Sequence, residues 1–356
     1  MLRPVIMIGC GGSGQKAVRY IRDAVRRRLE HSGWEGDFPK AWQFIGLDTL
    51  NIQESPGEIP TMPASDYKSI ALQFGTFSEL NDALLAQHSP QDGRGYKELI
   101  GWRPQAEQVN VPLRNGAGQM RAVGRTAGVV SLGTVVRPRI KDAFGACDAG
   151  GPELQQVSEL LGVPVPPGTT VPDPIVVVLG SMAGGTGAGI LLDVIDLVRR
   201  TDRRGAFPIA VIFTPDIFNF AANDAMSANG LAMMSELMSA YWDDERSYSE
   251  LIPDDVRVDN RGPHSTFLIG RKNLGGIDLN NSRNVYRAVG EALASWVSSS
   301  SVQDSVYNFI TVNWPMNAPD NMGGYPFDRV RQRGVISSFG SSTLSIGRDR
   351  FREFVA

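Results

Sequence analysis

Two glycine-rich loops in this chain have residue types and spacing that could bind a ligand. Residues 180–189 follow the apolar run 175–179 and precede an apolar stretch with helical spacing, and residues 9–14 follow the apolar run 5–8 in the same way. Without Cβ atoms, such loops allow the backbone to approach a bound group closely. The helix after each loop directs free N–H groups and its positive dipole end at that group. The two loops therefore predict an anion site, and one polyphosphate held between them is the simplest occupant.

The first loop by itself is open to other interpretations. Gly9, Gly11 and Gly14 have the spacing of a dinucleotide-binding fold, which would make the protein an NAD(P)- or FAD-dependent oxidoreductase. That fold places an acidic residue about 20 residues beyond the glycines, whereas Asp48 lies considerably further on. An oxidoreductase would also leave the second glycine loop without a task. Either loop could instead be a tight strand-to-helix turn, which the presence of both loops disfavours.

The wider pattern predicts an α/β fold with a doubly wound, mostly parallel sheet. Strand-like apolar runs alternate with helical periodicities, and such sheets bind ligands at the carboxyl ends of their strands, where both glycine loops fall. The expected strands are 4–9, 42–48, 175–180, 207–214 and 265–270. The expected helices are 14–30, 120–142, 188–200, 220–242 and 281–298. Residues 148–174, rich in Pro and Gly, are expected to form an extended connection.

Composition and charge exclude several classes of function. With 356 residues, 42% hydrophobic and 21% charged, the chain can bury a substantial core. A net charge of −3 offers no broad positive field, so nucleic acid is not an expected partner. Cys10 and Cys147 form no C-x-x-C pattern, which predicts neither a zinc site nor a disulfide framework and favours a cytoplasmic location. No run approaches the roughly 18 apolar residues of a membrane span.

Several segments together resemble a family. Residues 183–189 resemble the signature loop of the tubulin/FtsZ superfamily, whose members bind guanine nucleotide and polymerise head to tail. Residues 9–14 are similar to that family's first nucleotide loop, and residues 45–51 to its second. Residues 116–127 resemble the FtsZ-type third loop, which wraps the γ-phosphate, and residues 214–219 resemble the segment that contacts the ribose. The order and spacing of these segments agree with the family pattern, and the resemblance implies a Rossmann-type GTPase domain with a long central helix.

The resemblance implies a site for GTP or GDP with Mg²⁺. The implied nucleotide-binding residues are Gly11, Gly12, Ser13, Gly14, Gln15, Asp48, Gly116, Ala117, Gly118, Gly184, Gly185, Thr186, Gly187, Ala188, Gly189, Asn219, Asn223, Asn280, Asn281 and Asn284. Asn219 and Asn223 stand where FtsZ carries Glu and Arg on the ribose side, so the contact loses its charge. The asparagines at 280, 281 and 284 either hold the base or cap the central helix.

The hydrolytic residue is the least defined part of the resemblance. In the family, the next subunit of the filament delivers an acidic residue from a loop after the central helix. The expected acidic pattern is not cleanly present, and the candidates are Asp304, Asp320 and Asp328. For each of them a solvated surface carboxylate is the alternative.

The resemblance also implies a domain division. Residues 1–300 are expected to form the nucleotide-binding, GTPase-like domain, with an insertion at about 53–111 that carries one or two short helices, such as 77–87. Residues 301–356 are expected to form a connecting loop and the start of a second α+β domain, either truncated or replaced by a short natural variant.

The sequence therefore predicts a GTP-binding, tubulin/FtsZ-like protein that polymerises head to tail into cytoskeletal filaments. GTP and Mg²⁺ would lie between successive subunits, and whether the GTP is hydrolysed stays open. One alternative is a non-hydrolysing nucleotide-binding scaffold that acts with accessory or membrane-associated partners. The oxidoreductase is the other. The biological role of such a filament is beyond what the sequence defines.

Overall fold

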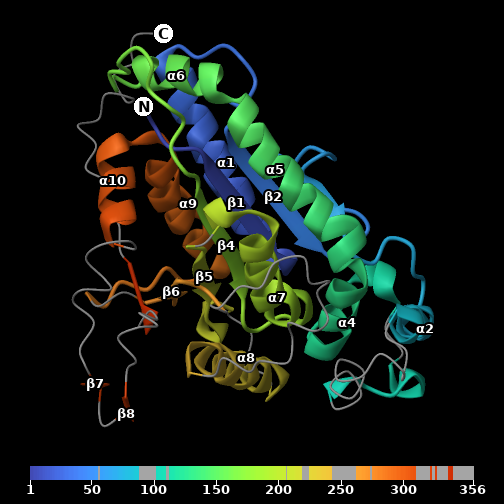
Figure 1. The fold of residues 1–356 in the computed structure, drawn as a ribbon. Coiled ribbons are helices and arrows are strands. Elements are labelled where there is room, and N and C mark those ends of the chain that lie inside the picture. The colour runs from blue at the N-terminus through green and yellow to red at the C-terminus, as the bar shows by residue number, and fades with distance from the viewer. Residues whose placement is uncertain are drawn as a thin grey trace.

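A seven-stranded parallel sheet forms the centre of the molecule (Figure 1). The computed structural model describes residues 1–54, 57–87, 102–109, 112–205, 207–218, 224–242, 262–272, 275–309, 321–322, 325–326 and 336–339. The strand order is β3-β2-β1-β4-β5-β6-β9, and each neighbouring pair is parallel. The bounds are β1 (Val5–Cys10), β2 (Trp42–Asp48), β3 (Tyr67–Ser69), β4 (Ile175–Ser181), β5 (Ile209–Phe213), β6 (Ser265–Ile269) and β9 (Ile336–Ser337). A separate antiparallel pair consists of β7 (Asn321–Met322) and β8 (Tyr325–Pro326).

Continuous apolar runs explain why the central strands are buried on both faces. Every residue of β1 and β4 is buried, as expected for a parallel sheet with helices on both sides. These two strands are neighbours, with Val5 paired to Ile175 and Cys10 to Gly180. Because they are parallel and end in register, the glycine loops that follow them leave the sheet side by side.

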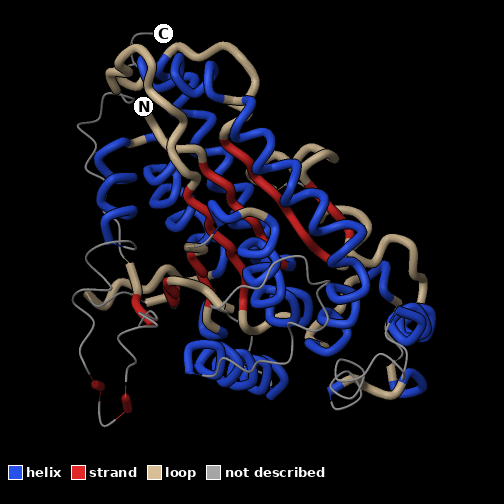
Figure 2. Tube along the Cα trace, viewed as in Figure 1, coloured by secondary structure: helices blue, strands red, loops and turns tan. Residues whose placement is uncertain are grey.

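Helices cover the two faces of the sheet in two groups, and Figure 2 shows the strands as one layer between them. One face packs against α1 (Gly11–Ser32), α6 (Gly151–Leu160) and α9 (Ser282–Ser298). The other packs against α2 (Phe77–Gln87), α4 (Arg121–Ser131), α5 (Arg137–Ala149), α7 (Gly185–Thr201) and α8 (Asp224–Trp242). α10 (Ser300–Asn308) follows α9, and a π-helical turn (Leu132–Val136) joins α4 to α5. Short 3-10 turns lie at Ala106–Gln108, Leu113–Asn115, Arg203–Gly205 and Pro215–Ile217. None of the described helices has both the length and the apolar character that crossing a bilayer requires.

The predicted α/β class and the strands of the sheet are confirmed, as is the helix predicted at 77–87, which is α2. The expectation that residues 148–174 form an extended connection is wrong, because α6 lies within them. Pro152 occupies the first turn of α6, where a missing N–H costs nothing, and Leu154 and Val157 are buried. The predicted insertion contains β3, which pairs with β2 at the edge of the sheet. Most of the expected second domain lies outside the described residues.

Two glycines allow the helices of one face to pack closely. A Cβ on Gly14 of α1 would lie 2.3 Å from the carbonyl oxygen of Leu179 in β4. A Cβ on Gly290 of α9 would lie 2.7 Å from the Cβ of Tyr20 in α1. Since real Cβ atoms do not approach so closely, glycine at both positions keeps α1 pressed against β4 and α9 pressed against α1. This packing fixes where the first turns of both helices lie.

Candidate functional site

A cavity of about 400 Å³ lies at the carboxyl ends of β1, β2 and β4. Its wall combines residues from the glycine loops and from the segments after β2 and before α4. The predicted site residues that line it are Gly12, Ser13, Asp48, Gly116, Ala117, Gly118, Gly184, Gly185, Thr186 and Gly187. The structure therefore brings together, in one cavity, segments that are far apart along the chain.

The two glycine loops touch each other at the floor of this cavity. A Cβ on Gly11, whose φ is +70°, would lie 2.5 Å from the backbone nitrogen of Gly187. α1 begins at Gly11 and α7 begins at Gly185, and neither has a capping side chain or an acidic residue in its first turn. The first-turn N–H groups of both helices therefore have no side-chain partner at their starts, an arrangement suited to a bound anion.

The segment before α4 is joined to the second glycine loop. The Gly185 N–H donates to the Gly118 carbonyl oxygen at 2.7 Å. Asn229 of α8, buried in the structure, donates its side-chain amide to the carbonyl oxygens of Gln119 at 2.8 Å and Ala183 at 3.0 Å. Asn229 was not predicted as a site residue, because its position within a long helix carries no distinguishing signal. These bonds hold the two loops in fixed positions around the cavity.

Thr49 connects the end of β2 with both of these loops. Its hydroxyl oxygen accepts the N–H of Ala117 at 2.9 Å and lies 2.8 Å from the hydroxyl oxygen of Thr186. Both threonines are buried. Thr49 was missed as a site residue, although it follows Asp48 directly and could have been found from that position. The Thr49 hydroxyl therefore links the end of β2, the 116–118 loop and the 184–187 loop to one another.

Asp48 places a buried carboxylate in the cavity wall. It is 3% exposed, and burial raises its pKa to about 6, although the Thr49 N–H donates to Oδ1 at 2.8 Å and opposes that shift. Hydrogen bonding to the Thr186 side chain and the Leu50 backbone also opposes the shift, but within the described part of the chain the buried Oδ2 has no hydrogen-bond partner at normal geometry. A carboxylate oxygen in this condition is stabilised either by a proton or by a cation.

An ion pair that the sequence analysis missed also lines the cavity. Lys16 Nζ lies 2.5 Å from Glu54 Oε2, and both side chains face the cavity. Lys16 lies two residues after the first glycine loop, a position that could have identified it. The partner, Glu54, comes from the segment after β2, and no sequence pattern indicates this pairing.

The other end of the cavity is more apolar and aromatic. Phe218, Met226, Ser282 and Tyr286 line it. The Tyr286 hydroxyl donates to Ser13 Oγ at 3.0 Å, and burial raises the pKa of Tyr286 to about 12, so the phenol is neutral. This contact joins α9 to the first glycine loop.

Other predicted residues do not line the cavity. Gly11, Gly14, Ala188 and Gly189 lie behind it, and Gln15 is fully buried with both polar atoms of its amide unpartnered. Asn219 and Asn223 lie outside the described residues.

Two of the three asparagines, Asn281 and Asn284, hold the start of α9. The Asn281 side chain caps α9 by accepting the N–H of Asn284 at 3.0 Å, and Asn284 Nδ2 donates to the Leu279 carbonyl oxygen at 2.8 Å. Asn280 adopts a φ of +67°, which asparagine tolerates better than most residues. These contacts correspond to the capping alternative, and Ser282 and Tyr286 are the residues of α9 that face the cavity.

The acidic candidates lie apart from the cavity or outside the described residues. Asp304 is exposed on α10, and the adjacent Gln303 accepts the Arg3 N–H at 2.7 Å, at the amino end of β1. This places Asp304 at the opposite end of the sheet from the cavity. Asp320 and Asp328 lie outside the described residues. Within the part of the chain that the structure describes, no group of three or more His, Cys, Asp or Glu side chains could hold a metal ion.

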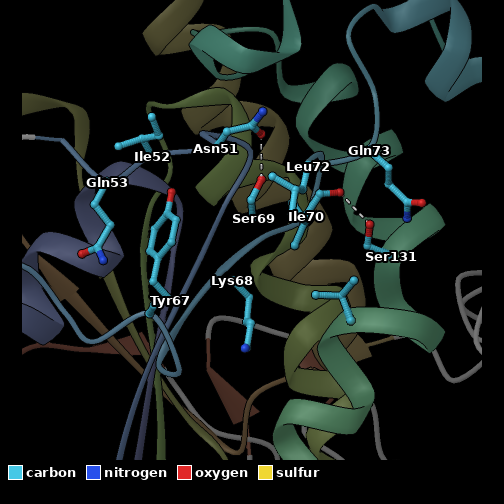
Figure 3. Close-up of a pocket in the computed structure, with 12 residues that line it drawn as sticks. Asn51, Ile52, Gln53, Tyr67, Lys68, Ser69, Ile70, Leu72, Gln73 and Ser131 are labelled. Carbon is cyan, nitrogen blue, oxygen red and sulfur yellow. Dashed lines mark hydrogen bonds between the residues drawn. The ribbon is translucent and has the colours of Figure 1, made fainter.

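A second hollow, of about 660 Å³, lies behind the segment that follows β2 (Figure 3). Asn51, Ile52 and Gln53 line one side of it, and Lys68 and Ser69 of β3 lie between them and α4. Ser69 Oγ donates to Asn51 Oδ1 at 3.1 Å. The segment from Leu50 to Glu54 is therefore a wall shared by the cavity and this hollow.

The chain was compared with family models and with solved structures, and both comparisons found a match. A family model described as "Tubulin like" matches residues 6–356. Among solved structures, CetZ1 from Haloferax volcanii, a GDP-bound monomer, is similar with a TM-score of 0.42 and 11% sequence identity. The match covers 87% of this chain and 64% of that chain, so this chain spans less than two thirds of that protein's length. No curated protein matches the chain.

The buried carboxylate of Asp48 predicts a pH-dependent stability. Its pKa is about 6 in the folded protein against an ordinary value of 3.8, so between these values the folded state holds a proton that the unfolded chain has released. Stability therefore falls as the pH rises through this window. We expect Asp48→Asn, which retains the acceptor for Thr49, to raise the unfolding free energy by on the order of 2 kcal/mol near pH 7.5 and by roughly a third of that near pH 4.5. Urea denaturation at the two pH values measures this, and an equal effect at both would contradict it.

Proposed function

The chain belongs to the tubulin-like family, and from that membership together with its cavity we propose that it binds a guanine nucleotide, GTP or GDP. The observation that carries the proposal is the convergence of two uncapped helix N-termini and three tied loops on one cavity. Helix N-termini attract phosphate through their free N–H groups and their dipoles. Two such termini facing one space suit a polyphosphate better than a single phosphate.

The phosphates would lie at the glycine end of the cavity. Gly12, Ser13 and the 184–187 loop offer backbone N–H groups there, and the 116–118 loop lies against Gly185. A γ-phosphate would contact the 116–118 loop, whose position depends on Thr49 and Asn229. Because this loop leads into α4, the presence of that phosphate would affect the position of α4.

The base would lie at the end of the cavity lined by Phe218, Ser282 and Tyr286. Aromatic faces there offer stacking, and the Ser282 hydroxyl offers a hydrogen bond. We assign the base to these residues rather than to Asn280, Asn281 and Asn284, which serve the start of α9. Asn219 and Asn223 remain the candidates for the ribose.

The donor set at the phosphate end fits Mg²⁺. Mg²⁺ takes oxygen ligands and commonly joins one or two carboxylates to the phosphates of a substrate. Asp48 Oδ2 is a buried carboxylate oxygen without a partner, and it is the atom that would hold the ion. When bound, Mg²⁺ would neutralise part of the charge of the β- and γ-phosphates.

We also propose that the protein assembles into a head-to-tail filament, and the position of Asp304 supports this. The nucleotide cavity lies at the carboxyl ends of the strands and Asp304 lies at the opposite end of the sheet. Stacking one copy on the next would bring α10 to the nucleotide of the neighbour. Asp320 and Asp328 follow α10 in the chain and remain candidates for the same role.

Nucleotide binding is tested by isothermal titration with GTP, GDP, ATP and NAD in the presence of Mg²⁺. NAD belongs in the panel because Gly9, Gly11 and Gly14 have the spacing of a dinucleotide-binding fold. We expect GTP and GDP to bind, and Gly12→Asp to weaken binding at least tenfold, roughly 1.4 kcal/mol, because it adds a carboxylate at the phosphates.

Gly12→Ala is the matched control for that substitution. Its Cβ would meet Asp48 Oδ2 at 3.9 Å and Glu54 Oε1 at 4.0 Å, which are ordinary contacts, so binding should stay close to the wild-type value. A preference for NAD, or the absence of GTP binding, would contradict the proposal.

Assembly is tested by phosphate release from GTP across a range of protein concentrations. If a neighbour completes the site, activity per subunit rises with concentration, and electron microscopy with a slowly hydrolysed GTP analogue shows filaments. One of Asp304→Asn, Asp320→Asn and Asp328→Asn should abolish release, whereas Asp142→Asn, on the exposed side of α5, should not. Filaments without phosphate release would favour the scaffold alternative, and release independent of concentration would contradict a shared site.

A further inference from the structure

The cavity carries few charges. Among the described residues that line it, Lys16, Asp48 and Glu54 are the side chains that carry charge at neutral pH. Two carboxylates and one ammonium give this wall a net charge of −1. A nucleotide triphosphate that enters it brings several further negative charges, which the two helix dipoles offset only in part.

The single ammonium group of this wall is already engaged. Lys16 Nζ lies 2.5 Å from Glu54 Oε2, with side chains that are 35% and 47% exposed. An ion pair this exposed is weak and exchanges readily when a stronger partner arrives. The Glu54 carboxylate nevertheless competes with any phosphate for the charge of Lys16.

Glu54 also adds a second carboxylate at the start of α1. The Cβ position of Gly12 lies 3.9 Å from Asp48 Oδ2 and 4.0 Å from Glu54 Oε1. A phosphate that approaches the N–H groups of this first turn therefore meets carboxylate oxygens from both residues. Like charges at such distances repel strongly where water is partly excluded, unless a cation lies between them.

Hydrogen bonds of the preceding residues hold the segment that carries Glu54 in place. The side chain of the preceding Gln53 makes paired hydrogen bonds with the Met62 backbone, donating at 2.8 Å and accepting at 2.9 Å. The Tyr67 hydroxyl donates to the Leu50 carbonyl oxygen at 2.7 Å. Figure 3 shows Asn51, Ile52 and Gln53 lining the hollow beside β3. Leu50 and Glu54, at the two ends of the same segment, line the nucleotide cavity instead.

We infer that Glu54 makes nucleotide binding depend on a divalent cation, by holding Lys16 and by presenting a second carboxylate beside Asp48 at the phosphates. The cavity then accepts a nucleotide with its cation and rejects the metal-free polyphosphate. This specificity role rests on the proposed function, because it concerns the same cavity. Glu54 acts on the charge of the ligand and needs no direct bond to the base.

The test compares GTP affinity in Mg²⁺ and in EDTA for the wild-type protein and for Glu54→Gln. We expect the wild type to bind at least tenfold more weakly in EDTA, roughly the effect of one partly buried charge pair. Glu54→Gln should gain about tenfold in EDTA and show less than about a threefold difference between the two buffers. Lys16→Met should weaken binding in both buffers and retain the difference.

Glu58→Gln is the matched control. Glu58 lies in the same connection after β2 and pairs with Arg283 and Arg287 rather than with a residue of the cavity. It should retain the wild-type difference between the two buffers. Thermal denaturation of each variant without nucleotide confirms that the fold is unchanged.

Two results would overturn the inference while leaving the proposed function intact. One is equal wild-type binding in Mg²⁺ and EDTA. The other is a Glu54→Gln variant that keeps the wild-type difference, or that loses affinity in Mg²⁺ with no gain in EDTA. A wild-type protein that binds GTP in neither buffer would instead contradict the proposed function itself.

Discussion

The direct contact between two glycine loops is the constraint on which the rest of the structure depends. β1 and β4 are parallel neighbours and end in register, so the loops after them emerge together. A Cβ on Gly11 would lie 2.5 Å from the Gly187 nitrogen, and any side chain there would push α1 and α7 apart. The two helix N-termini face one cavity because glycine occupies both sides of this contact.

Patterns local in sequence predicted the framework, and contacts between distant segments were not predictable. The apolar runs predicted the buried strands β1 and β4, and the glycine loops after them predicted the place of the cavity. The pairing of Lys16 with Glu54 depends on how the segment after β2 crosses α1, which no periodicity encodes. α6 was missed because Gly and Pro indicate a loop by composition, although proline is well accommodated in the first turn of a helix.

Opposing charges define the character of the cavity. Helix dipoles and backbone N–H groups favour an anion, whereas Asp48 and Glu54 oppose one. Asp48 is held in place through Thr49, which also connects the 116–118 loop with Thr186. Thr49 therefore holds the carboxylate through its backbone N–H and the two loops through its hydroxyl, so a ligand in the cavity would affect α4 and α7 together.

Hydrogen–deuterium exchange with and without GTP and Mg²⁺ tests the central claim most directly, because it reports on backbone N–H groups at each loop. The account predicts slower exchange in all three of the segments 11–13, 116–118 and 184–187 when GTP is bound. Protection limited to one of these segments, or located at the hollow beside β3, would contradict a polyphosphate held jointly by the two helix starts.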